Sequence, residues 1–197
     1  MLSHALHYYS HWARQRIGEM DAAIVTLQRH IERSHAGRES RQLVADLKKR
    51  RNRFKALVSK QAKRNEAAWD QAKTRMESEW EDFEAVLTAY LKKAKRQSGF
   101  QKSTFRKVAD AQSEAWREVD RSLRALARKA MPARRSALTT VIKRIRNNGA
   151  VVRKRTTKLS RSAMISWSVM HSALNATRKA FDRANHQATK AVQRAFR

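Results

Sequence analysis

The chain has 197 residues, with 45 Lys and Arg against 17 Asp and Glu, a formal net charge of +28 and no cysteine. These numbers exclude disulfide scaffolds and cysteine-ligated metal centres, and a hydrophobic content of 41% is too high for a wholly disordered basic tail. Four Gly and one Pro are too few for the turns of a many-stranded sheet, so we expect an all-α fold.

The N-terminal half, residues 1–97, is predicted to form a long helical hairpin with a turn near Gly37. Before Gly37, apolar residues recur every three or four positions, the spacing that places them along one side of a helix. These residues are Ile17, Met20, Ile24, Leu27 and Ile31. From residue 40 to residue 97 there is no Gly or Pro and the periodicity continues, so we expect one uninterrupted helix about 85 Å long.

The second half, residues 98–197, is predicted to form a strongly basic helical hairpin. Pro132 interrupts its apolar stripe and should kink or restart the helix, and Gly99 and Gly149 lie in polar clusters typical of helix-ending turns. Short turns favour antiparallel neighbours. The sequence therefore predicts an elongated antiparallel helical bundle, or coiled-coil hairpins, of about four long helices, continuous over both halves. Unequal helix lengths leave homo-oligomer formation possible.

The longest uncharged stretch, residues 162–177, is too short and too polar to span a bilayer, so we interpret it as a buried helix segment. Residues 1–18 contain no continuous apolar segment of the kind found in secretory signals. We therefore expect a cytoplasmic protein.

Three tryptophans, Trp69, Trp116 and Trp167, recur at intervals of 47 and 51 residues. Two interpretations are open: an internal duplication, or three helices that each place a large aromatic at one level of the bundle. Tryptophans that stack on nucleic-acid bases should be exposed, whereas these lie on or beside the apolar seams.

The segments 67–73 (AAWDQAK) and 79–83 (EWEDF), which follow an amphipathic and a basic helix, resemble small bacterial coiled-coil proteins labelled stress-responsive. The stretch from Ser166-Trp167 to residues 180–184 (AFDRA) is similar to the Trp-containing repeats of that family. The resemblance implies an all-helical fold with no known enzymatic activity, no cofactor and no catalytic residues. Those proteins tend to be acidic or balanced in charge, whereas this chain is strongly basic.

The charges are distributed unevenly along the chain. Residues 121–181 contain 16 Lys and Arg and no acid, and residues 48–64 contain nine basic residues and no acid. Residues 66–84, by contrast, contain seven acids and two bases. This acidic band can offset part of the repulsion across a helix pair, but a net charge of +28 leaves a large excess for an external polyanion.

Nucleic acid is the commonest polyanionic partner, and the guanidinium group of arginine is well shaped to donate paired hydrogen bonds to phosphate oxygens. No helix-turn-helix, zinc-finger or RNA-recognition signature is present, so we expect contacts without sequence specificity, in an architectural or nucleoid-type role. Ten candidate contact residues flank Gly149 and should gather at one end of the second hairpin: Arg134, Arg135, Lys143, Arg144, Arg146, Arg153, Lys154, Arg155, Lys158 and Arg161. A second candidate patch consists of Lys48, Lys49, Arg50, Arg51, Arg53 and Lys55.

The alternative is a membrane-surface or scaffolding protein whose basic face meets anionic lipid, another polyanion, while its apolar stripes pack internally or insert. Few exposed bulky apolar residues would favour nucleic acid over this alternative.

We expect a non-enzymatic protein with no cofactor, no metal and no small-molecule substrate. His4, His7 and His11 can share one helix face, but no Asp or Glu precedes Glu19 to complete a metal site. No histidine follows the acids of residues 77–84 at metal-binding spacing, and there is no glycine-rich phosphate loop.

Overall fold

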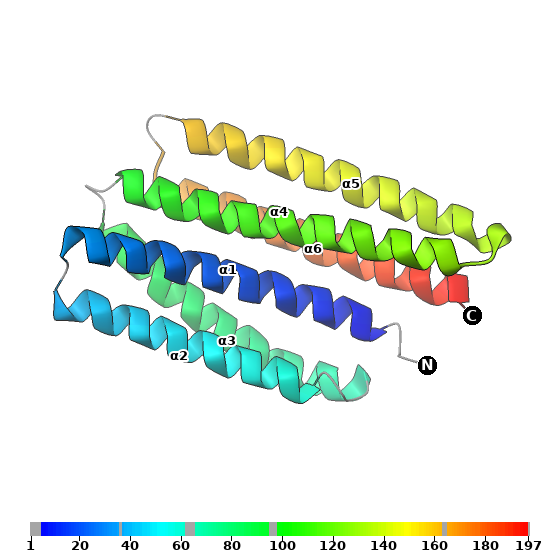
Figure 1. The fold of residues 1–197 in the computed structure, drawn as a ribbon, viewed down its shortest axis with the longest axis horizontal. Coiled ribbons are helices and arrows are strands. Elements are labelled where there is room, and N and C mark those ends of the chain that lie inside the picture. Colours follow the sequence, from blue (N-terminus) through cyan, green and yellow to red (C-terminus); the bar gives the residue numbers. More distant parts are fainter. Residues whose placement is uncertain (1–4, 36, 62–65, 95–97, 163–164, 197) are drawn as a thin grey trace.

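The computed structural model describes residues 5–35, 37–61, 66–94, 98–162 and 165–196, which form six α-helices and no strand. The helices run alternately up and down the long axis of the molecule (Figure 1). An all-helical bundle is confirmed, with six helices among the described residues where the sequence predicted about four. The helices are α1 (Ala5–Ser34), α2 (Arg38–Gln61), α3 (Glu66–Lys93), α4 (Ser98–Lys129), α5 (Pro132–Arg161) and α6 (Trp167–Phe196).

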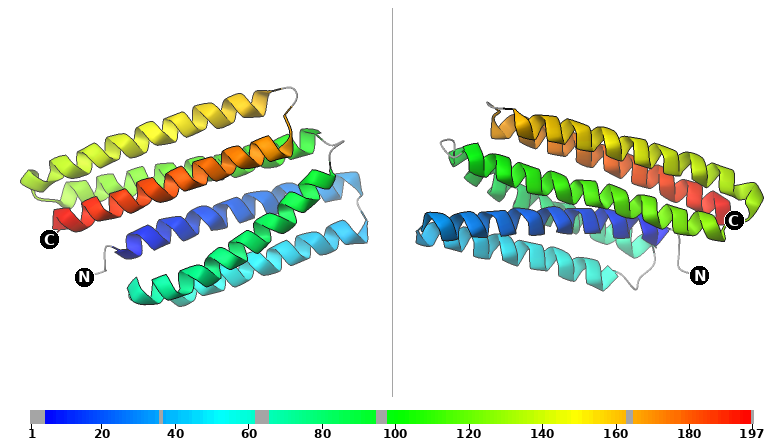
Figure 2. Two further views of the ribbon diagram at one scale, coloured as in Figure 1. Left: turned by 180° about the vertical axis from the view of Figure 1, so that it is seen from behind. Right: turned by 45° about the horizontal axis from the view of Figure 1, so that its top comes forward.

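The six helices form two groups of three. In the first group α1, α2 and α3 pack against one another, and in the second α4, α5 and α6 do the same. The groups meet mainly where α1 lies against α4, and α6 also contacts α1 and α3 (Figures 1 and 2). Helices α2 and α5 therefore lie at opposite edges of the molecule.

The expectation of one helix from residue 40 to residue 97 is wrong. Helix α2 ends at Gln61 and α3 begins at Glu66, and the two pack antiparallel; residues 62–65 lie outside the described part of the chain. The hairpin places the acidic band against the basic run, so that Arg53 Nε lies 3.0 Å from Glu79 Oε1. No Gly or Pro marks this turn. The change from the basic run of residues 48–64 to the acidic band of residues 66–84 is the sequence feature that indicates it.

The predicted turn at Gly149 is also wrong, because Gly149 lies inside α5 and is buried. A Cβ atom at this position would lie only 3.2 Å from the Cβ of Trp116 on α4. Glycine here allows close approach of two helices rather than a change of direction. The true break follows Arg161, so residues 162–177 are not one buried helix; α6 begins at Trp167, and residues 163 and 164 lie outside the described residues.

Other predicted boundaries agree with the structure. The chain turns at Gly37 between α1 and α2, and Pro132 occupies the first turn of α5, where its missing N–H costs no hydrogen bond. Gly99, which was predicted to lie in a helix-ending turn, instead lies in the first turn of α4, although the break between α3 and α4 does fall just before it.

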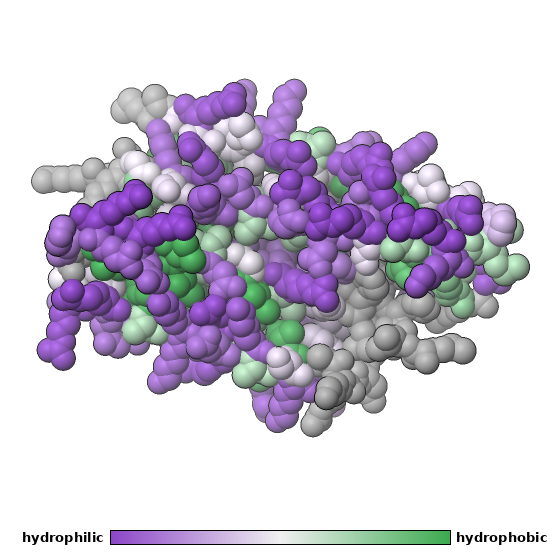
Figure 3. Space-filling model, viewed as in Figure 1, coloured by the Kyte–Doolittle hydropathy of each residue, from purple (hydrophilic) through white to green (hydrophobic). Residues whose placement is uncertain are grey.

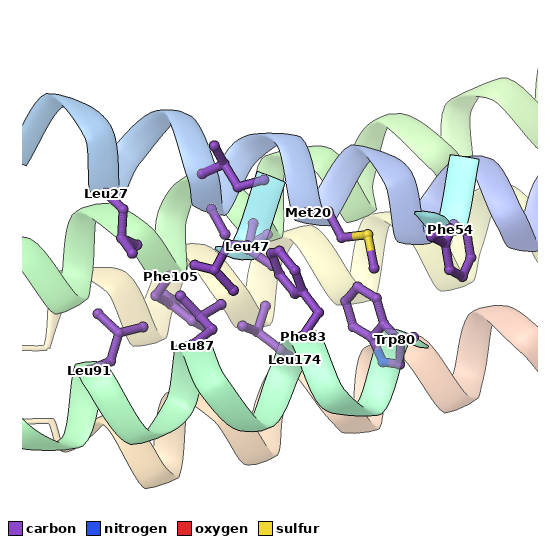
Figure 4. Close-up of a cluster of buried hydrophobic side chains, with 14 of the residues drawn as sticks. Met20, Leu27, Leu47, Phe54, Trp80, Phe83, Leu87, Leu91, Phe105 and Leu174 are labelled. Carbon is purple, nitrogen blue, oxygen red and sulfur yellow. The ribbon is translucent and has the colours of Figure 1, made fainter. Parts of the chain in front are cut away.

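The main hydrophobic core joins the two groups. Figure 4 shows Met20 of α1, Leu47 of α2 and Phe83 of α3 in one cluster with Phe105 of α4 and Leu174 of α6. A second cluster fills the space between α4, α5 and α6. Because α4 and α6 contribute to both clusters, the two groups of helices share a core.

The three repeated tryptophans belong to these cores and are 2–3% exposed. Trp69 stacks on Tyr9 at the N-terminal ends of α3 and α1, with 5.4 Å between ring centroids. Trp167 begins α6 at the other end of the bundle, beside Leu87. The interpretation that places all three at one level is therefore wrong, and none of them presents a face for base stacking.

Candidate nucleic-acid interface

The ten candidate residues that flank Gly149 all lie on α5 and all are exposed. Because α5 is continuous through Gly149, they do not gather at one end of a hairpin. They extend along a single helix about 45 Å long at one edge of the molecule (Figure 1). We call these ten residues the α5 basic surface. Figure 3 shows hydrophilic side chains along this edge.

The α5 basic surface points in three directions around the helix. With Ile145 and Val152 in the core, the helical period places Lys143, Lys154 and Lys158 on the opposite, outward side. Arg161 lies on this outward side as well. Arg144 and Arg155 lie on the flank towards α6, and Arg135, Arg146 and Arg153 lie on the flank towards α4, whereas Arg134 in the first turn lies on the same side as Val152. A partner that approaches from outside therefore meets cations over more than half of the helix circumference.

Almost none of this charge is neutralised within the protein. Arg146 Nε lies 3.8 Å from Asp120 Oδ1 of α4, and Arg135 donates a 3.4 Å hydrogen bond to the carbonyl oxygen of Ala130. Within the described residues, no other member of the α5 basic surface forms an ion pair with a carboxylate. Helix α5 itself contains no Asp or Glu.

The second candidate patch, on α2, is largely neutralised. Four of its six residues form ion pairs with acids of α1 and α3, and of the other two Lys48 is half-buried and Lys49 exposed. The structure thus separates two patches that the sequence could not distinguish. The ion pairs of this α2 basic patch are Arg50–Asp82, Arg51–Asp21, Arg53–Glu79 and Lys55–Asp21.

The surroundings of α5 are also basic. Residues 98–197 contain 24 Lys and Arg against 5 Asp and Glu. Two of these acids form ion pairs with arginines of α4 itself. Glu114 pairs with Arg117 and Arg121, both at 2.7 Å, and Asp120 pairs with Arg124 at 2.9 Å. The hydrogen bond from Arg121 lowers the pKa of Glu114 below its ordinary value, more than slight burial raises it.

A buried ionic network lies between the two groups of helices, and the sequence did not reveal it. Arg178 of α6, 6% exposed, donates hydrogen bonds to Glu19 of α1 at 2.9 Å and to Glu84 of α3 at 2.8 Å. The ring of Trp80 lies 4.6 Å from its guanidinium carbon. Burial lowers the pKa of Arg178, but the charges of Glu19 and Glu84 raise it by more, so the arginine stays charged.

A histidine joins this network through Glu84, and a second arginine, whose guanidinium carbon lies 5.6 Å from the centroid of the Trp80 ring, forms a further buried pair beside it. Arg16 of α1 pairs with Asp182 of α6 at 2.8 Å, and His171 Nε2 lies 3.1 Å from Glu84 Oε1. Burial raises the pKa of Glu84, but the hydrogen bond from His171 and the charge of Arg178 outweigh it, so the pKa is lowered. Every charge here has a partner within the protein. The network therefore joins α1, α3 and α6 and is not a binding surface.

One weak signal of this network is present in the sequence: Arg178 lies one turn after Leu174 and one turn before Phe181, on the apolar side of its helix. Because residues 121–181 contain no acid, nothing nearby in the sequence distinguishes Arg178 from the exposed cations of that run. Its partners are Glu19 and Glu84, far away in the sequence.

No cluster of three His, Asp or Glu side chains suitable for a metal occurs among the described residues. His4 of the predicted histidine group lies outside them. In the same part of the chain, none of the helices combines the length and the apolar character needed to cross a lipid bilayer. Comparison with family models, curated proteins and solved structures gives no match for this chain.

Proposed function

We propose that this protein binds nucleic acid through phosphate contacts made by α5, without sequence specificity, in a non-enzymatic, architectural role in the cytoplasm. The observation that carries the proposal is the α5 basic surface, whose ten exposed cations lack acidic partners among the described residues apart from the long contact of Arg146. Like charges at such spacing repel one another. A phosphate backbone would relieve this repulsion and release its own condensed counterions.

Six members of the α5 basic surface lie on its outward side or on the side towards α6: Lys143, Arg144, Lys154, Arg155, Lys158 and Arg161. Six simultaneous phosphate contacts would give a slope of log affinity against log salt of about −5 on duplex DNA. The straight helix spans about 45 Å, over which a duplex presents more than enough phosphates for this number of contacts.

The test is a mobility-shift assay on random-sequence duplex DNA and single-stranded RNA across a salt series. In the Lys154→Gln/Lys158→Gln variant, we expect weaker binding to all sequences and a slope shallower by about 2. The matched control is Arg50→Gln/Arg53→Gln, which removes the same charge from the α2 basic patch but should change the slope little, because those arginines already pair with Asp82 and Glu79. Equal effects of the two variants, or no binding near physiological salt, would contradict the proposal.

The second candidate is a membrane-surface or scaffolding role, possible also for a stress-related protein of the kind that the sequence resembles. The exposed large apolar side chains among the described residues are scattered over α1, α5, α6 and the α4–α5 connection, which favours nucleic acid over insertion into lipid. Anionic vesicles belong in the same assay, because binding to vesicles alone would favour this second role. The exposed residues are Val25, Met131, Val151, Val169 and Phe196.

A further inference from the structure

A groove runs along the surface between α5 and α6, which lie side by side in the left view of Figure 2. It consists of three adjoining hollows. Arg155 and Ala176 line the first and second hollows, and Asn148, Ala184 and Gln187 line the first and third, so the hollows are continuous. Along α6 the groove extends from residue 168 to residue 194, about 39 Å.

The floor of the groove exposes apolar side chains beside polar ones such as Ser172 and Gln187. Val151 of α5 is 65% exposed and Val169 of α6 is 49% exposed, and both line it. Between them α6 presents alanines, including Ala176 and Ala180, whose side chains are too short to fill the space towards α5. A helix laid on this floor could approach closely, as small residues permit at helix–helix contacts.

Both rims of the groove are basic. Arg144 and Arg155 border it from α5, and Arg183, Lys190 and Arg194 border it from α6. All five side chains are exposed, and none forms an ion pair with an acid of the described residues.

We propose that this groove docks an amphipathic helix of a partner protein, one with a narrow apolar stripe flanked on both sides by Asp and Glu. The apolar stripe would cover Val151 and Val169, and the acids would meet the basic rims, an arrangement that follows the general helix-in-groove mode of recognition. Phosphate groups gain nothing from an apolar floor, so the groove suits an acidic helix better than nucleic acid. The inference goes beyond nucleic-acid binding: of the six cations assigned to phosphate contacts, only Arg144 and Arg155 also border the groove, and the other four lie on the outward side of α5.

The probe is a fluorescein-labelled synthetic helix of about 21 residues, with Leu and Ala in the apolar stripe and Glu on both flanks, measured by fluorescence anisotropy at about 150 mM salt. A second peptide carries Lys in place of every Glu. We expect the Glu peptide to bind with a micromolar dissociation constant and the Lys peptide not to bind.

Two variants of the full chain place the binding in the groove. Ala176→Trp fills the floor at an exposed position, and Arg183→Glu/Lys190→Glu reverses one rim; each should weaken binding of the Glu peptide by about tenfold or more. The control Lys154→Glu/Lys158→Glu makes the same change of charge on the outward side of α5 and should weaken it much less. Circular dichroism establishes that each variant is folded.

The same variants separate this proposal from nucleic-acid binding. Duplex DNA should bind Ala176→Trp as it binds the original chain, while the outward control binds DNA weakly. Equal loss of peptide binding in the rim variant and the outward control would overturn the groove proposal, since it would indicate attraction by net charge alone. Binding of anionic vesicles in place of the peptide, or self-association that Ala176→Trp abolishes, would also overturn it, in favour of lipid or a second copy of the chain.

Discussion

Replacing Arg178 with Met should destabilise the protein strongly. The substitution keeps an unbranched apolar stem against Trp80 but removes the charge that faces Glu19 and Glu84. Glu19 is 1% exposed, so water cannot replace the lost cation, although the 3.0 Å hydrogen bond from Gln112 remains. A buried carboxylate without its cation is expensive because its desolvation is no longer offset.

The expected loss is about 3–5 kcal/mol, the cost of removing one partner from a buried ion pair. For a chain of this size each kcal/mol corresponds to about 2–4 °C, so the melting temperature should fall by roughly 6–20 °C. Chemical denaturation followed by far-UV circular dichroism measures the free energy of unfolding directly. The double variant Glu19→Gln/Arg178→Met removes both charges and should recover much of the loss, because no buried charge at residue 19 is then unpaired.

The control is Arg53→Gln, which breaks the 3.0 Å pair with Glu79 at a site where the arginine side chain is 47% exposed. Such a surface pair contributes about 0–1 kcal/mol. If Arg178→Met costs no more than Arg53→Gln, or if the double variant is no more stable than Arg178→Met, the network does not hold the two groups of helices together.

Three further predictions concern stability. Gly149→Val should cost about 1–3 kcal/mol in denaturation experiments, because even a Cβ would lie 3.2 Å from Trp116; an unchanged midpoint would contradict the close approach. Since folding lowers the pKa of Glu84, its contribution is present above the ordinary value of 4.5 and lost as the pH falls through the lowered pKa; the stability advantage over Glu84→Gln should shrink in that acidic range, and a constant difference would refute the pairing. Added salt or duplex DNA should raise the melting temperature by relieving repulsion on α5, and a melt indifferent to both would refute this.

The periodicity of apolar residues was sufficient to predict an all-helical bundle but not the number of helices or all of their ends. Met20 occupies the core as its spacing indicated, and Leu47 and Phe83, from the segment where the periodicity continues, lie in the same core cluster. A continuous apolar periodicity, however, is compatible with two arrangements. One long helix gives it, and so do two shorter antiparallel helices whose apolar faces pack against each other. The chain reverses between Gln61 and Glu66 and again after Arg161 without Gly or Pro, whereas Gly149 has the sequence context of a turn but lies where α4 and α5 approach closely.

The candidate site was predictable as a set of residues but not as a surface. The partners that neutralise a cation lie far away in sequence: Arg53 and Glu79 are 26 positions apart, and Arg178 and Glu19 are 159 apart. A run of basic residues therefore looks the same whether tertiary contacts neutralise it, as on α2, or leave it unpaired, as on α5. Arg178 is the opposite case: it belongs to the acid-free run of residues 121–181, yet it is buried, which the sequence does not indicate.

The difference between α2 and α5 is informative because the two helices occupy equivalent places, each at an edge and packed on the other two helices of its group. The neighbours of α2 supply Asp21, Glu79 and Asp82 to its arginines and lysine. The neighbours of α5 bring only Asp120 near it among the described residues, and at 3.8 Å. An edge helix in this fold can thus be neutralised by its own group, so the unneutralised charge of α5 is not a requirement of the architecture, and this contrast with α2 is the reason for proposing an external polyanion.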